Sequence, residues 1–153
     1  MPPRWVEALQ RGSIVFGKVE LAPGAKLSDV ARALGFEASA ADRYTVTTPV
    51  LGFAAQPVEL VFVKKKLHTV RCVDPAWKST GTSWDDYDPA IDVANFHATE
   101  KRFLKTLGLA AKANEVGGLQ TLWRFDGIEL ALIYELRTPS VGIFVTPYRA
   151  RKS

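Results

Sequence analysis

The chain has 153 residues, of which 47% are hydrophobic and 24% charged, and its formal net charge is +4. This length fits one domain with one core, and the composition excludes an intrinsically disordered chain. No apolar stretch approaches the ~20 residues that a membrane helix needs, and the first residues lack the apolar core of a signal peptide. We therefore expect a single domain over residues 1–153, placed in the cytoplasm and without a membrane partner.

The N-terminal part reads as two short helices separated by a strand. Trp5–Gln10 predicts the first helix, and Ser13–Leu21 predicts one half-buried strand because its second half alternates apolar and polar residues. Leu27–Gly35 carries an apolar stripe at helical spacing. Ser28 is expected to cap the start of that helix, and Gly35 to take the left-handed conformation that closes it.

Strand-like runs follow the second helix. Pro49, Gly52 and Pro57 punctuate the next stretch, so we expect Thr45–Gln56 to be an interrupted or edge strand. Val58–Val63 and Leu67–Val73 form the clearest hairpin of this half.

The remainder repeats that order of elements. A helix is expected over Asp88–Gly108, opening with a cap residue followed by proline, and Asp126-Gly127 is a strong hairpin turn. The strands expected around that turn are Leu119–Phe125, Ile128–Leu136 and Val141–Pro147. Short connections favour antiparallel pairing. The sequence thus predicts an α+β fold with antiparallel sheet and helices packed on one face, in two pseudo-repeated halves of about 13–74 and 84–148.

Residues suited to catalysis are sparse. Of the two histidines, neither has a second histidine or cysteine at metal-ligand spacing, and no glycine-rich phosphate loop follows a strand. His68 and the single cysteine, Cys72, lie in a strand pattern, where structural roles are expected. His97 and Glu100 can meet on one helix, which suits acid–base chemistry, but a packing contact is the expected role. We therefore expect no enzyme, metal or cofactor.

The predicted long helix has one mostly apolar face, interrupted by a single carboxylate. Its members are Val93, Phe96, Glu100, Phe103, Leu104 and Leu107.

An acidic and aromatic segment joins the two halves. Its candidate partner-binding residues are Trp77, Trp84, Asp85, Asp86, Tyr87, Asp88 and Asp92. One interpretation is a solvated loop. The other is a recognition loop, because aromatic anchors beside charged groups are typical of the residues that dominate protein interfaces.

Positive residues cluster at Lys64–Lys66 and Arg149–Lys152. A solvated hairpin turn and a solvated tail are the expected roles, because the other cations are scattered. The alternative is a nucleic-acid-binding module that uses this basic hairpin and tail for phosphate contacts.

The second half resembles a group of small bacterial proteins, several of which look like immunity proteins of polymorphic or type VI secreted toxins. The resemblance rests on Ser83–Tyr87, His97, Leu104–Gly108, Trp123–Ile128 and Val141–Tyr148. The first half is similar to the tandem repeats of β-lactamase-inhibitor-like proteins. The chain departs from the pattern in a longer helix after His97 and in a hairpin turn of lysines, and no active-site residue is carried over.

This resemblance implies a protein that binds and inhibits a cognate toxin or effector in the cytoplasm. Such inhibition requires an exposed binding surface and no cofactor. Under this reading, nucleic acid is not the expected partner.

Overall fold

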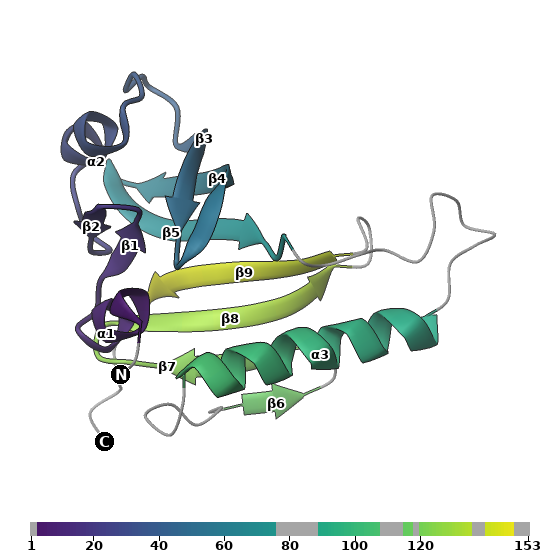
Figure 1. Ribbon diagram of the computed structural model, residues 1–153. Coiled ribbons are helices and arrows are strands. Elements are labelled where there is room, and N and C mark those ends of the chain that lie inside the picture. Colours follow the sequence, from purple (N-terminus) through teal and green to yellow (C-terminus); the bar gives the residue numbers. More distant parts are fainter. Residues whose placement is uncertain (1–2, 76–88, 108–114, 118–119, 136–139, 149–153) are drawn as a thin grey trace.

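The computed structural model is an α+β fold in which helices lie against a twisted antiparallel sheet (Figure 1). The structure describes residues 3–75, 89–107, 115–117, 120–135 and 140–148. In chain order the elements are α1 (Arg4–Gln10), β1 (Ile14–Phe16), β2 (Val19–Leu21), α2 (Leu27–Leu34), β3 (Arg43–Val50), β4 (Phe53–Val63), β5 (Lys66–Val73), α3 (Pro89–Leu107), β6 (Glu115–Gly117), β7 (Gln120–Arg124), β8 (Ile128–Glu135) and β9 (Ser140–Pro147).

Two antiparallel meanders form the main sheet. Its seven strands run in the order β3-β4-β5-β9-β8-β7-β6, and β1 and β2 make a separate pair. The last strands of the two meanders, β5 and β9, pair with each other, with Val70 opposite Val145 and Cys72 opposite Ile143. The predicted α+β class and antiparallel pairing are confirmed. The internal repeat stays a prediction, because strand order alone does not establish a duplication.

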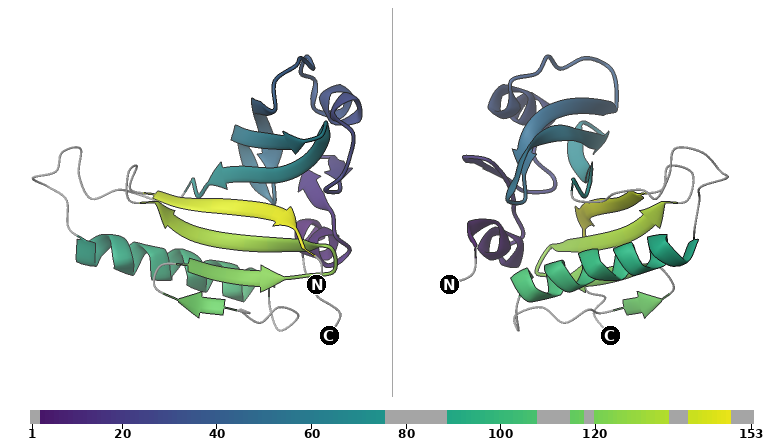
Figure 2. Two further views of the ribbon diagram at one scale, coloured as in Figure 1. Left: turned by 180° about the vertical axis from the view of Figure 1, so that it is seen from behind. Right: turned by 45° about the vertical axis from the view of Figure 1, so that its right-hand side comes forward.

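One face of the sheet carries a continuous row of buried side chains. Leu60, Val70, Val145, Leu130 and Trp123 lie opposite one another across five neighbouring strands, and each is at most 1% exposed. Burying a side chain of this kind contributes about 1.5–3 kcal/mol. Figure 2 shows α3 lying alongside this part of the sheet.

The contact between α3 and the sheet is aromatic. Phe103 stacks on Trp123 with ring centroids 6.2 Å apart and an interplanar angle of 28°. Phe96 and Phe103 are buried as predicted, but Leu104 is 37% exposed and Thr99 is buried instead. The predicted face was therefore wrong at Leu104, because Thr99 turns toward the sheet to bond a buried carboxylate. No described helix is both long and apolar enough to cross a membrane.

The start of α2 differs from the prediction. Gly35 closes the helix at φ 75°, as expected, but the N-cap is Lys26 and no side chain caps it, so Ser28 lies inside the first turn. The cause is a tertiary contact: the backbone N–H of Leu27 donates to the carbonyl of Lys65 at 2.9 Å. That bond satisfies a helix-start donor that a serine cap would otherwise serve.

Ser13–Leu21 is not one strand. Ile14 pairs with Leu21 and Phe16 with Val19, across a turn in which Gly17 has φ 63°. The prediction failed because it overlooked this glycine, which adopts the left-handed conformation that a tight turn requires.

Strand boundaries also differ from expectation. β4 begins at Phe53 rather than Val58, and Pro57 fits inside it opposite Thr47. Proline is accommodated because pairing of β4 with β5 begins only at Glu59. The interruption predicted within Thr45–Gln56 is a turn at residues 51–52, which divides this range between β3, at the sheet edge, and β4. The short edge strand β6 was not predicted. The turn at Asp126-Gly127 is confirmed, with Gly127 at φ 88°.

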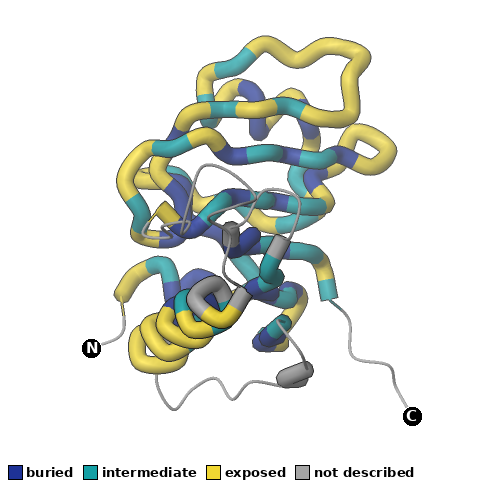
Figure 3. Tube along the Cα trace, turned by 90° about the vertical axis from the view of Figure 1, so that its right-hand side faces the viewer, coloured by how far each residue is buried: buried dark blue, intermediate teal, exposed yellow. Residues whose placement is uncertain are grey.

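Figure 3 shows how burial follows this architecture. Buried segments concentrate where the helices meet the sheet, and the outward side of α3 is exposed.

Candidate functional site

The recognition segment predicted from the sequence falls almost wholly outside the described residues. Trp77, Trp84, Asp85, Asp86, Tyr87 and Asp88 all lie there, and Asp92 lies in α3 with a side chain that the structure does not describe. Their role as a partner-binding surface stays a prediction.

The two described elements that flank this segment are joined by a buried polar link. The side chain of Asp74, just after β5, is fully buried and lies 2.5 Å from Nη2 of Arg102. The hydroxyl of Thr99 donates to the same carboxylate oxygen at 3.0 Å, and Arg102 donates to the Thr99 hydroxyl at 3.1 Å. The end of β5 is thereby fixed to the middle of α3. A buried charge is tolerated only with such partners.

A second polar contact holds α3 against β7. The Thr121 hydroxyl donates a short hydrogen bond to Glu100 Oε2, and His97 Nδ1 lies 3.5 Å from Glu100 Oε1. Thr121 is fully buried, whereas the His97 side chain is 52% exposed. Glu100 is therefore held by a structural partner, which agrees with the packing role expected for the His97–Glu100 pair.

The lone cysteine is buried in the sheet. Cys72 is 2% exposed, and its pKa is raised to about 12, first by burial and then by the nearby Asp74 carboxylate. Its thiol is therefore protonated at neutral pH and a poor nucleophile. His68 is exposed and pairs with the neighbouring Thr69 hydroxyl at 2.8 Å. Both agree with the structural roles expected from the sequence.

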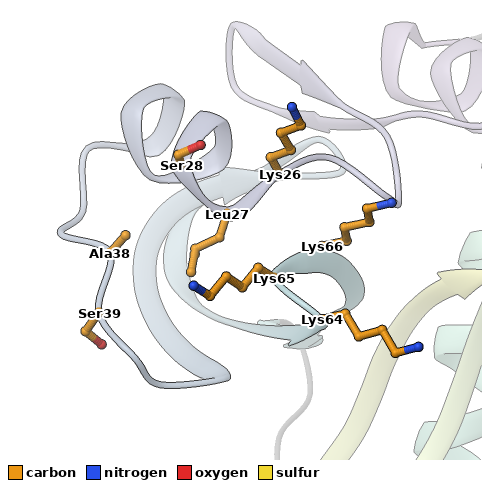
Figure 4. Close-up of a pocket in the computed structure, with 8 residues that line it drawn as sticks. All are labelled: Lys26, Leu27, Ser28, Ala38, Ser39, Lys64, Lys65 and Lys66. Carbon is orange, nitrogen blue, oxygen red and sulfur yellow. The ribbon is translucent and has the colours of Figure 1, made fainter.

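A cleft of about 460 Å³ lies beside the β4–β5 turn. Figure 4 shows the residues around it. We call it the lysine cleft, because four of its eight lining residues are lysines. The lining residues are Lys26, Leu27, Ser28, Ala38, Ser39, Lys64, Lys65 and Lys66.

Backbone bonds assemble the lysine cleft from two distant segments. Lys26 forms an isolated antiparallel bridge with Lys66. Gly24 N–H donates to the Leu67 carbonyl at 2.7 Å, and Leu67 N–H donates to the Ala25 carbonyl at 2.8 Å. The chain that leads into α2 therefore runs along the start of β5. This brings Lys26 to the basic turn.

Sequence reasoning found three of the four lysines and missed Lys26. The hairpin at Lys64–Lys66 is a local pattern, readable from the strands on either side. Lys26 joins it through contacts about 40 residues apart in the chain, which no local pattern reports.

Acidic residues do not complete a metal site in the described part of the chain, where no cluster of three or more histidines, cysteines or carboxylates has suitable geometry. Comparisons of this chain with protein-family models, with curated proteins and with solved structures find no match.

Proposed function

We propose that this chain is an immunity-type protein that binds and inhibits a cognate bacterial toxin or effector by protein–protein interaction in the cytoplasm. Its binding surface is the segment from Trp77 to Asp92. The inhibitor acts by covering the toxin, so its own chemistry requires no cofactor and no nucleophile.

The observation that carries the proposal is the buried link of Asp74 to Thr99 and Arg102. It fixes the end of β5, which precedes the binding segment, relative to α3, whose first turn carries Asp92 at the end of that segment. Fixing the two ends of a binding segment reduces the conformational entropy that the segment loses on association, so more of the contact energy appears as affinity.

The residue types of the segment indicate the chemistry of the partner. Trp84 and Tyr87 are anchors that fill apolar pockets, and Asp85 and Asp86 favour a basic rim around those pockets. The proposed target is thus a toxin surface that combines an apolar hollow with lysine or arginine.

The test compares two variants that each remove two carboxylates. Trp84→Ala/Asp85→Ala/Asp86→Ala should weaken toxin binding by at least about a hundredfold, since hot-spot residues each contribute about 2 kcal/mol or more. Glu37→Ala/Asp42→Ala changes two exposed residues elsewhere and is the control for net charge.

Titration calorimetry with the purified toxin measures the affinity, and thermal melting checks that both variants fold. Equal affinity of the two variants would remove the segment from the interface.

A further inference from the structure

The lysine cleft carries positive charge that no acidic lining residue neutralises. None of its eight lining residues is acidic, and in the described part of the chain no carboxylate pairs with Lys26, Lys64, Lys65 or Lys66. Several arginines elsewhere are paired: Arg11 lies 2.9 Å from Glu20, for example. Four lysine side chains of like charge start from the rim of this cleft, so they raise the affinity of the surrounding surface for an anion.

The turn that carries two of these lysines is conformationally costly. Lys64 has φ 52° and Lys65 φ 61°, and two left-handed residues in a two-residue hairpin normally select Asn-Gly or Asp-Gly. Each non-glycine residue in this conformation costs about 1 kcal/mol. Folding therefore favours other residues at these positions, and this conflict is typical of a functional site.

The directions of the side chains indicate the shape of the ligand. Figure 4 shows Lys65 extending toward Leu27 and the loop of Ala38, while Lys26, Lys64 and Lys66 extend outward in different directions. A single small anion can reach few of these amines, whereas an extended anion can contact them in succession. None of the lining residues is aromatic, so stacking on nucleobases does not contribute and contacts fall on phosphates.

We propose that the lysine cleft binds a linear chain of phosphate groups. A single-stranded nucleic-acid backbone and inorganic polyphosphate both supply this chemistry. The proposal is independent of toxin binding, because the cleft shares no residue with the segment from Trp77 to Asp92.

The experiment measures binding of labelled oligo(dT) and, separately, of inorganic polyphosphate to three proteins. These are the unchanged chain, the cleft variant Lys26→Gln/Lys64→Gln/Lys65→Gln, and the control Lys18→Gln/Lys101→Gln/Lys105→Gln. The control removes the same charge from exposed lysines that do not line the cleft.

Loss of at least about tenfold in affinity is expected for the cleft variant alone. The slope of log affinity against log salt should also fall by about 0.7 for each lysine that contacts single-stranded phosphate. If only oligo(dT) or only polyphosphate shows binding that depends on the cleft, this supports the proposal and identifies the source of the phosphates.

Equal losses in the cleft and control variants would overturn the proposal, since general positive charge would then explain binding. If the unchanged protein bound neither oligo(dT) nor polyphosphate, the proposal would be overturned too. A second variant, Lys64→Asn/Lys65→Gly, keeps the test valid if glutamines disturb the turn, because it supplies the preferred turn residues. It should also lose affinity.

Discussion

The Thr99 hydroxyl donates a 3.0 Å hydrogen bond to Oδ2 of Asp74, and this bond joins the end of β5 to the middle of α3. Both residues are 1% exposed, so water cannot replace either partner. The bond spans 25 positions in the chain and crosses the boundary between the two predicted halves. It therefore ties the two predicted halves to each other.

Replacing this carboxylate should be among the most destabilising polar changes in the described part of the chain. Asp74→Ala leaves the Thr99 hydroxyl without its acceptor and is expected to lower the free energy of unfolding by about 3 kcal/mol. Urea denaturation measures the change. Arg43→Gln is the control. It removes the ion pair of the exposed Arg43 with Glu59, in which Nη1 and Oε1 lie 3.7 Å apart, and it should cost less than about 1 kcal/mol. Equal effects would refute the importance of the buried link.

Gly52 is required by a close contact with α1. A Cβ atom there would lie 2.5 Å from Nε1 of Trp5, and the residue has φ +103°. Gly52→Ala should therefore cost about 2–4 kcal/mol, from backbone strain and overpacking together.

Gly35→Ala is the matched control for that change. Gly35 has φ +75° with nothing within 4 Å of its added Cβ, so only the backbone cost of about 1 kcal/mol applies. Thermal melting of the two variants should show a clearly larger loss at Gly52. The reverse order would contradict the Trp5 contact.

The lysine turn should be more stable when it is rebuilt with ordinary turn residues. Lys64→Asn/Lys65→Gly relieves two left-handed lysines and is expected to raise the free energy of unfolding by about 1 kcal/mol. Chemical denaturation of the two proteins at one salt concentration tests this. A loss of stability would show that the lysines serve the fold itself.

Burial of Cys72 makes stability depend on alkaline pH. The folded thiol has a pKa raised to about 12 from its ordinary value of 9.0, so the unfolded chain loses this proton first. The contribution of the thiol is complete below pH 9.0 and is lost as the pH rises toward 12, by about 1.4 kcal/mol per pH unit. Chemical denaturation across that pH range should show that the free energy of unfolding falls less steeply with pH in Cys72→Ala than in the unchanged chain. Parallel slopes would count against a buried thiol.

Local patterns were sufficient for most of the fold. The strands around Asp126-Gly127 were predictable because the turn residues and the apolar runs agree. Gly17 is a similar turn signal within Ser13–Leu21, and β6 is too short to give any. The predicted cap at Ser28 is wrong, because a backbone hydrogen bond from Leu27 to Lys65 takes the place of a side-chain cap.

The candidate sites were less predictable, for one physical reason. Both the lysine cleft and the Asp74 link depend on contacts between residues far apart in the chain. In the sequence, nothing distinguishes Thr99 from other polar residues of the helix. Its role depends on Asp74, 25 residues away in the chain. Periodicity reports which face of an element is apolar, and it contains no information on which distant side chain meets that face.

Toxin binding is the central claim, and affinity capture followed by a neutralisation assay tests it most directly. The tagged chain is exposed to lysate of its own cells, and retained proteins are identified by mass spectrometry. We predict one stoichiometric protein that stops growth when expressed alone and is neutralised by this chain but not by Trp84→Ala/Asp85→Ala/Asp86→Ala. Capture of no such protein, or full neutralisation by that variant, would contradict the account.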